Sequence, residues 1–508
     1  MSNKKYIMSL DSGTTSCRTL IIDQKGEIVS VCQSEFTQFF PHSGWVEHDP
    51  IEIWTTQLGT MQSAKNQAEI HTSEIAAIGI TNQRETIVMW DKETGLPVYN
   101  AIVWQDRRTS EYCDELIKQG HEKMISEKTG LIINPYFSGT KIRWILQNAE
   151  AAKKKLAQNK LLCGTIDTWL IWKLTEGKVH ATDVTNASRT MLFNIHTLEW
   201  DQEILDLLEI PRSILPEVKS SSELYGYSEP RFLSQRSEHK VPISGVAGDQ
   251  QAALFGQLCT DVGMVKNTYG TGCFALINTG TKAIQSKNRL LTTIAWRIKN
   301  QPTIYALEGS VFIAGSAIKW LRDSIKILYS ASECDFYCDL AEQQEEQNVY
   351  IVPSFTGLGA PYWDSYSRGA IFGLERGTKR EHIIKATVEA IAYQSYDLLK
   401  AMEKDLEQNI KVLRVNGGAS NSNYLMQFQS SICNLDVERP ISVETTALGA
   451  AFFAGLAVNY WNSLDEIKKI YKVEKTFKPC LNQAEINKKI KGWNEAVKRT
   501  LSWTKSIE

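Results

Sequence analysis

The stretch SLDSGTTSCRTLIID, residues 9–23, carries one carboxylate and a run of small hydroxyl residues between two apolar segments. Apolar residues at 6–10 and 19–22 predict two buried strands, and the intervening Gly-Thr-Thr-Ser predicts a tight turn. Backbone N–H groups and hydroxyls in such a turn can bind a phosphate, and Asp11 would then hold a magnesium ion that bridges phosphate oxygens. An ordinary hairpin turn has the same composition, so this stretch alone leaves both interpretations open.

A similar stretch, KNTYGTGCFALINTG, occupies residues 266–280 and also predicts a strand, a Gly-Thr turn and a second strand. Gly13 and Gly270 lie 257 positions apart, close to half of the 508-residue chain. A duplicated domain would explain this spacing, with each copy offering a turn to a shared cleft; a chance similarity of two short hairpins is the alternative. A third glycine-rich stretch, RVNGGASNSNYL at residues 414–425, follows an apolar segment and precedes a predicted helix.

The remaining patterns predict alternating strands and helices. Residues 75–81, IAAIGIT, form a continuous apolar run typical of a strand buried on both faces, and residues 86–98 predict a strand, a turn and another strand. Asp49 and Pro50 mark a helix start, and residues 384–402 place apolar side chains on one helical stripe. Residues 447–458 are apolar but shorter than the roughly 20 residues that cross a bilayer, which indicates a buried helix. We therefore expect an α/β architecture.

The composition argues against several functional classes. A formal charge of −2 gives no general attraction to nucleic acid or to an anionic membrane. The ten cysteines are scattered and lack paired zinc-ligand spacing, which favours reduced thiols over a disulfide framework. The N-terminus is unlike a secretory signal. We therefore expect a cytoplasmic protein with no membrane insertion and no nucleic-acid partner.

Several polar residues stand where predicted strands end. Arg84 and Glu85 follow the apolar run at 75–81, where side chains often line a cleft, although an adjacent Arg and Glu can also form a surface ion pair. Asp249, in SGVAGDQQAALFGQ, would either cap the helix that begins there or present its carboxylate to a cleft. Trp104 ends an apolar run in NAIVWQDRR, and Tyr136 lies in NPYFSGTK.

Taken together, a series of ordered motifs resembles the FGGY family of carbohydrate kinases over essentially the whole chain. The motifs are LDSGTTSCR, GWVEHDP, GITNQRET, NAIVWQDRR, PYFSGTK, GTIDTWLIWKLT, TNASRTMLFN, SGVAGDQQAALFGQ, NTYGTGCF, FTGLGAPYWD and ALGAAFFAGLAV. The resemblance is to the members that phosphorylate glycerol, and TNQRET and PYFSGTK distinguish them from kinases of pentuloses, hexuloses and other polyols. It implies an α/β fold of two duplicated ribonuclease-H-like domains, the ATPase core of actin and sugar kinases, with a cleft between them.

The resemblance also implies a domain layout and a reaction. Residues 1–257 would form an N-terminal domain with the glycerol site and the first phosphate loop, and residues 258–508 a C-terminal domain with most of the nucleotide site. The reaction would be ATP-dependent phosphorylation of glycerol to sn-glycerol 3-phosphate, the first step of glycerol catabolism, with Mg²⁺ as cofactor and a dimer or tetramer as the assembly. The alternatives are a kinase for another small polyol or ketose and a nucleotide-binding scaffold of the actin or chaperone type.

Site residues follow from the resemblance, position by position. Asp249 would be the general base and Asp11 the magnesium ligand. The residues expected to bind glycerol are Arg84, Glu85, Tyr136, Asp249 and Gln250, with Trp104 and Phe274 as an apolar wall. The residues expected to bind the nucleotide are Thr14, Thr15, Ser16, Arg18, Thr271, Gly315, Lys319, Gly418 and Ser422.

The chain departs from the family pattern at a few places. Lys319 stands where a glutamine often borders the adenine pocket, Asn416 replaces an acidic residue, and Ser422 stands where an asparagine is usual, which puts nucleotide preference in question more than catalysis. Some bacterial members carry a Gly-x-Arg motif that helps to bind fructose 1,6-bisphosphate at a tetramer interface. Residues 238–240 are Glu-His-Lys here, and lysine cannot form a bidentate phosphate clamp, so we expect weak or absent inhibition.

Overall fold

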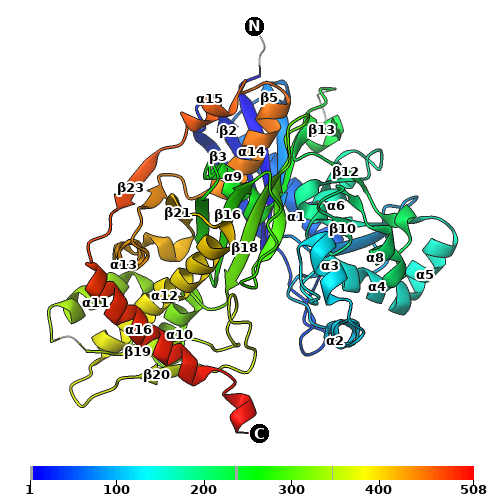
Figure 1. Ribbon diagram of the computed structural model, residues 1–508. Helices are drawn as coiled ribbons and strands as arrows, with labels where there is room; N and C mark the ends of the chain where they lie inside the picture. Colours follow the sequence, from blue (N-terminus) through cyan, green and yellow to red (C-terminus); the bar gives the residue numbers. More distant parts are fainter. Residues whose placement is uncertain (1–3, 235–237, 346, 508) are drawn as a thin grey trace.

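The computed structural model describes residues 4–234, 238–345 and 347–507, and two large mixed sheets form its centre (Figure 1). The first sheet has the strand order β13-β14-β5-β1-β2-β3. Its strands are β1 (Tyr6–Ser12), β2 (Ser16–Asp23), β3 (Ile28–Glu35), β5 (Ile75–Asn82), β13 (Ser222–Tyr227) and β14 (Pro242–Gly248). Every residue of β5 is buried, as its apolar run predicts.

The second sheet has the strand order β17-β18-β16-β15-β21-β22-β23. Its strands are β15 (Met264–Tyr269), β16 (Cys273–Gly280), β17 (Leu291–Trp296), β18 (Ile304–Val311), β21 (Val412–Asn416), β22 (Val437–Pro440) and β23 (Val473–Phe477). The turn at residues 270–272 joins β15 to β16, just as the turn at residues 13–15 joins β1 to β2.

The two sheets repeat one topology. In the first sheet, β1 pairs antiparallel with β2 and parallel with β5. Strand β5 in turn pairs parallel with β14, and β14 pairs antiparallel with the edge strand β13. In the second, β15, β16, β21, β22 and β23 repeat the same directions in the same order. A chance similarity of two hairpins would not extend to five strands, so the repeated sequence pattern reflects a duplicated fold.

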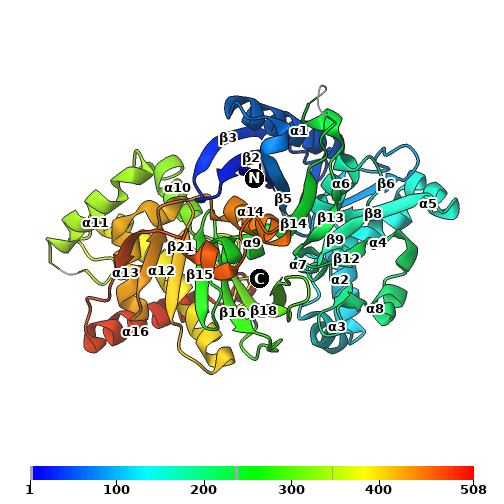
Figure 2. The same ribbon diagram turned by 90° about the horizontal axis from the view of Figure 1, so that it is seen from above.

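Two helices lie between the sheets, α9 (Asp249–Gly256) and α14 (Thr445–Ala457) (Figures 1 and 2). A Cβ on Gly256 would lie 1.9 Å from the Thr445 carbonyl oxygen, and a Cβ on Gly449 would lie 1.9 Å from that of Ala252. The helix backbones therefore touch at a point that only glycine allows. The prediction of a buried helix near residues 447–458 is confirmed.

A smaller module joins the flank of the first sheet, in cyan and teal in Figure 1. Its sheet has the order β4-β7-β6-β8. The strands of this region are β4 (Glu47–His48), β6 (Ile87–Asp91), β7 (Ala101–Ile102), β8 (Leu161–Thr165), β9 (Ala181–Asp183), β10 (Phe193–Asn194), β11 (Glu199–Trp200) and β12 (Glu217–Lys219). Its helices are α2 (Ser110–Lys118), α3 (Glu122–Thr129), α4 (Ser138–Asn148), α5 (Glu150–Ala157), α6 (Ile166–Leu174), α7 (Val184–Ala187) and α8 (Gln202–Leu207).

The other helices cover the two large sheets. They are α1 (Pro50–Gln67), α10 (Gly315–Asp323), α11 (Cys334–Glu342), α12 (Arg380–Leu406), α13 (Asn423–Cys433), α15 (Leu464–Lys468) and α16 (Gln483–Thr500), and a short sheet is formed by β19 (Tyr350–Val352) and β20 (Ala370–Phe372). Within the described ranges, no helix is both long and apolar enough to cross a membrane.

Two local sequence signals agree with the structure, and one does not. The Asp49 carboxylate accepts the Ile51 N–H at 2.8 Å, which caps α1 as predicted. The apolar stripe within 384–402 is buried along α12. The second strand expected within residues 86–98 is wrong, because Pro97 forms only an isolated bridge with Trp90 and proline lacks the N–H that a ladder needs.

Candidate active site

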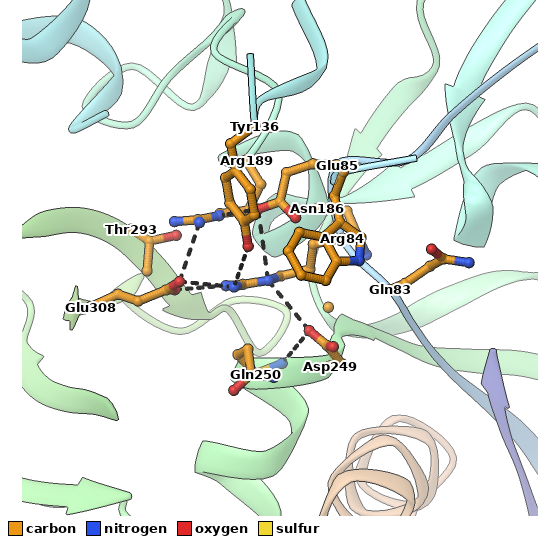
Figure 3. A network of polar contacts seen from close by, with 12 residues as sticks. Gln83, Arg84, Glu85, Tyr136, Asn186, Arg189, Asp249, Gln250, Thr293 and Glu308 are labelled. Atoms are coloured by element: carbon orange, nitrogen blue, oxygen red, sulfur yellow. Dashed lines mark hydrogen bonds and ion pairs between the residues drawn. The ribbon is translucent and has the colours of Figure 1, made fainter. Parts of the chain in front are cut away.

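A buried network of four charged side chains lies where β5 ends (Figure 3). The two terminal nitrogens of Arg84 donate to the two carboxylate oxygens of Glu308, at 2.6 and 2.8 Å. Arg189 donates through Nε to Glu85 at 2.6 Å and through Nη2 to Glu308 at 3.2 Å. All four side chains are at most 2% exposed, so each charge depends on its partners.

The charges within the network determine whether its two glutamates are ionised. Burial alone would raise the pKa of Glu308, but Arg189 and Arg84 outweigh it and lower the value to about 2. Burial also raises the pKa of Glu85, opposed by Arg84 and Arg189. Glu308 therefore stays ionised and holds Arg84 in one orientation from β18, a strand of the second sheet.

Asp249 lies at the open side of this network. It is the first residue of α9, and its Oδ1 lies 3.3 Å from the Nε of Arg84 and accepts the adjacent Gln250 N–H at 2.7 Å. The N-cap position belongs to Gly248, so Asp249 does not cap the helix in the usual manner. Its side chain is 32% exposed, against 2% for Arg84, which leaves the carboxylate accessible to a ligand.

Aromatic side chains form one wall beside Arg84. The Trp104 and Tyr136 rings meet edge to face with centroids 5.5 Å apart, and the Tyr136 hydroxyl accepts from Arg84 at 3.4 Å. The indole N–H of Trp104 donates to the Thr14 hydroxyl at 3.0 Å. This wall therefore contacts the first hairpin turn directly.

Gln250 and Phe274 share one partner that sequence reasoning missed. The ammonium of Lys266, on β15, donates to Oε1 of Gln250 and to the Phe274 carbonyl, the latter at 3.0 Å. Its lack of exposure distinguishes Lys266 from an ordinary surface lysine.

The first hairpin turn is held against the end of β5. The Gln83 backbone N–H donates to Ser12 at 2.8 Å, and its side chain donates to the Gly13 carbonyl at 3.0 Å. The Ser16 hydroxyl accepts from Gln33 at 3.0 Å, and Thr15 accepts the Phe36 N–H. The predicted turn at residues 13–15 is confirmed, with Thr14 and Thr15 at its tip.

Asp11 lies among charged groups beside this turn. It pairs in register with Arg18, which also forms an ion pair with Glu444, just before α14. Burial raises the pKa of Asp11 to about 7, Arg18 opposes this shift, and Asp249 and Glu444 add to it. The carboxylates outnumber the cation, so a positive ion would be stabilised here.

The residues around Asp11 fit a magnesium ion that is held jointly by the protein and a phosphate. Across the residues that the structure describes, no group of three or more His, Cys, Asp and Glu side chains could hold a metal by itself. Mg²⁺ ordinarily takes one or two carboxylates together with phosphate oxygens and water. Asp11, beside the turn at residues 13–15 that is predicted to bind phosphate, fits that pattern.

The second turn packs against the start of α10. The Gly315 N–H donates to the Gly270 carbonyl at 2.9 Å, and the Ser316 hydroxyl donates to that of Thr271 at 2.9 Å. Gly417 has a φ of 90°, and a Cβ there would lie 2.6 Å from the Tyr269 carbonyl oxygen. The structure thus brings together Thr271, Gly315 and Gly417, the residue before Gly418. A Cβ on Gly418 itself would meet no atom within 4 Å.

The positions that depart from the family pattern have structural partners. The Ser422 hydroxyl caps α13 by accepting the Leu425 N–H at 3.0 Å, and it also donates to Asp335. The amide nitrogen of Asn416 donates to the Thr445 hydroxyl at 2.7 Å, at the start of α14. Lys319 is exposed on α10. Ser422 therefore already uses its hydroxyl within the protein.

Three charged residues of the site escaped sequence reasoning: Arg189, Lys266 and Glu308. Each carries a signal, because Lys266 and Glu308 interrupt apolar strands and Arg189 lies within the motif TNASRTMLFN. A buried charge requires a partner, but the partner lies on another element, Arg84 after β5 for Glu308 and Gln250 on α9 for Lys266, and the sequence does not reveal this.

The core is a duplicated α/β fold with a Gly-Thr turn in each half, at residues 13–15 and 270–272, and a polar cluster between the halves. These features define the sugar-kinase class of two-domain enzymes. The FGGY family of carbohydrate kinases matches the chain in both parts, its N-terminal domain over residues 6–256 and its C-terminal domain over residues 265–458. The chain therefore belongs to the FGGY family of carbohydrate kinases and is an enzyme of that family.

Two full-length relatives are named glycerol kinase. A glycerol kinase of Malacoplasma penetrans is 74% identical over 506 residues and one of Haemophilus influenzae is 55% identical over 508 residues, each covering 100% of both chains. The crystal structure of Plasmodium falciparum glycerol kinase with ADP superimposes with a TM-score of 0.92 at 39% identity, over 98% of both chains. A xylulose kinase from Lactobacillus acidophilus has the same fold, with a TM-score of 0.86 at 23% identity over 97% of both chains.

Proposed function

We propose that this enzyme is an ATP-dependent glycerol kinase, which transfers the γ-phosphoryl group of ATP to a terminal hydroxyl of glycerol and releases sn-glycerol 3-phosphate and ADP. The observation that carries the proposal is a partly exposed carboxylate, Asp249, 3.3 Å from the buried Arg84 that Glu308 holds in place. Identities of 55–74% to full-length glycerol kinases favour glycerol over other polyols.

The polar cluster has the chemistry to bind a small triol. Arg189 donates to Oε1 of Glu85, which leaves Oε2 free to accept a hydrogen bond from a substrate hydroxyl. The Nε of Arg84 would exchange its contact with Asp249 for a substrate oxygen. An alcohol lacking one hydroxyl would leave a buried group unpaired and would bind more weakly. Tyr136 and Gln250 complete the polar lining, with Trp104 and Phe274 against the carbon edge.

Asp249 is placed to act as the general base. It would accept the proton of the terminal hydroxyl as that oxygen bonds to the γ-phosphorus and the bond from phosphorus to the β,γ-bridging oxygen breaks. General-base assistance of this kind contributes about 10²–10⁴ in rate. The rest of the acceleration comes from positioning and from groups that stabilise the phosphoryl charge.

The nucleotide would lie between the two turns. Backbone N–H groups and hydroxyls of Thr14, Thr15, Ser16 and Thr271 would bind its phosphates, with Arg18 beside them, and Gly315, Lys319, Gly418 and Ser422 would border the nucleoside. Asp11 would hold Mg²⁺, which when bound neutralises phosphate charge. This assigns the glycerol site and first turn to residues 1–257 and most of the nucleotide site to residues 258–508. The assembly would be a cytoplasmic dimer or tetramer.

The alternative is a kinase for another small polyol or ketose, favoured only by the shared fold of the xylulose kinases. A coupled assay of ADP release with glycerol, erythritol, xylulose and dihydroxyacetone separates the two. We expect kcat/KM to be highest for glycerol, by at least tenfold. Preference for xylulose or erythritol would overturn the proposal, and so would ADP release that does not depend on any of these substrates.

A further inference from the structure

Lys266 has a complete set of hydrogen-bond acceptors. Its ammonium donates to Oε1 of Gln250, to the Phe274 carbonyl at 3.0 Å and to the Thr268 hydroxyl at 3.1 Å. An ammonium has three donors and no acceptor, so these three partners satisfy it. The lysine therefore links β15, β16 and the first turn of α9 at one point.

This arrangement determines which way the Gln250 amide faces. A glutamine amide has one end that accepts and one that donates, and the two ends look alike in shape. Because the ammonium can only donate, the carbonyl oxygen of Gln250 must face Lys266, and its NH₂ group is turned away. Gln250 is only partly buried and adjoins Asp249, at the open side of the site.

The surroundings also bear on the charge of the lysine. Burial lowers the pKa of Lys266 to about 7; Glu308 and Asp249 favour the charged form, and Arg84 disfavours it. The lysine donates to three partners, and the ammonium has the three N–H bonds that this requires, whereas a neutral amine has two. The geometry and Glu308 therefore both support the ammonium.

We propose that Lys266 is a positioning residue that holds the Gln250 amide with its NH₂ group toward the substrate, so that Gln250 donates to a substrate oxygen. The inference rests on the proposed polyol kinase function. A donor at this position leaves the proton of that hydroxyl free for a carboxylate acceptor. It also selects for a substrate with an oxygen at this place, because an aliphatic carbon would leave the NH₂ group of Gln250 unpaired.

The first test is the variant Gln250→Glu, compared with Gln250→Ala. Glutamate keeps an acceptor for Lys266 but has no NH₂ group, so we expect glycerol binding to weaken about tenfold, as in Gln250→Ala. Binding is measured by thermal-shift titration with glycerol and without ATP, alongside the KM. If Gln250→Glu bound glycerol as tightly as the wild type, the amide would accept rather than donate and the proposal would be overturned.

The second test is a double-mutant cycle between Lys266→Met and Gln250→Ala. We expect Lys266→Met to raise the KM for glycerol about tenfold, with smaller changes in kcat and in the KM for ATP. In the Gln250→Ala background it should add less than about twofold, because the lysine acts through Gln250. Independent, multiplying effects would overturn the proposal. If Lys266→Met did not fold, the Gln250→Glu measurement alone would decide.

The matched control is Lys385→Met on α12. Lys385 is also largely buried, at 17% exposure. Its ion pair with Glu342 at 2.7 Å joins α12 to α11, outside the site. We expect its KM for glycerol to be unchanged. Wild-type turnover of glycerol tests the proposed function separately; if another polyol were the substrate, the same cycle run with that polyol would still test Lys266.

Discussion

At the scale of single residues, Arg84 and Glu85 are placed by constraints that other parts of the chain supply. Glu85 has a φ of 62°, a left-handed conformation that costs a non-glycine residue about 1–3 kcal/mol. Arg189 holds its carboxylate, and Glu308 holds Arg84. The strained backbone is retained at the residues expected to meet the substrate.

Replacing Glu308 with glutamine should therefore affect both stability and substrate binding. It leaves two buried arginines with one carboxylate, so we expect the free energy of unfolding to fall by about 3–5 kcal/mol and kcat/KM for glycerol to fall at least tenfold. Urea unfolding and steady-state kinetics measure the two effects.

The control for this change is Glu93→Gln. Glu93 is 54% exposed and pairs with Lys160 at 2.7 Å, so its loss should cost about 0–1 kcal/mol. Equal effects of the two substitutions would show that the buried network has no special role.

Asp249→Asn tests the base. The amide cannot take a proton, so kcat should fall by about 10²–10⁴, while the ATP dissociation constant should change less than about threefold. Single-turnover kinetics and equilibrium nucleotide binding provide the two readouts. Undiminished turnover would remove Asp249 from the chemistry.

At the scale of elements, the contact between α9 and α14 depends on two glycines. Gly449→Ala would place a Cβ 1.9 Å from the Ala252 carbonyl oxygen and force the helices apart. We expect a loss of about 3 kcal/mol in the free energy of unfolding, measured in urea.

Gly59→Ala on α1 is the matched control, because a Cβ there meets no atom within 4 Å. Alanine in an exposed helix interior should stabilise by about 0.5–1 kcal/mol. Similar effects of both alanines would mean that the helix contact tolerates a side chain.

At the scale of the whole molecule, Asp397 should make stability depend on pH. It accepts from Tyr362 at 2.8 Å and from Trp493 at 2.6 Å, which joins α12 to α16 and to the loop before β20. Burial raises its pKa from 3.8 to about 6, against the lowering effect of the bonds from Trp493 and Tyr362. The folded state therefore holds a proton that the unfolded state has lost between about pH 4 and 6.

Proton linkage determines whether the free energy of unfolding rises or falls with pH. Because the native state binds more protons, the wild type should lose stability as pH rises through that window, by about 3 kcal/mol relative to Asp397→Asn. Urea unfolding of both proteins from pH 3.5 to 7.5 measures this difference. A difference independent of pH would contradict the assignment.

Regulation is also a property of the whole molecule. Lys240 stands where some family members carry an arginine. Its Nζ lies 3.4 Å from Oε1 of Glu229, so the Glu229 carboxylate would compete with a phosphate for the ammonium. We expect fructose 1,6-bisphosphate to inhibit weakly or not at all in an activity titration. Strong micromolar inhibition would refute this expectation.

Much of the fold was predictable because its signals are local. The strand pair around residues 13–15, the buried β5, the cap of α1 and the helix α14 all follow from hydrophobic period and turn chemistry. The strand expected near residues 96–98 failed, because the local pattern did not account for the missing N–H of Pro97.

The sequence by itself determined the α/β plan and the candidate residues near the strand ends, since both depend on residues close together along the chain, while the duplication was implied by a resemblance to the FGGY family that runs along the whole chain. Only the tertiary structure decided that Glu308 orients Arg84, that Arg189 holds Glu85 and that Lys266 faces Gln250. These partners lie 16–224 positions apart, and a buried charge chooses its partner by distance in space, which is defined only once the two sheets have packed.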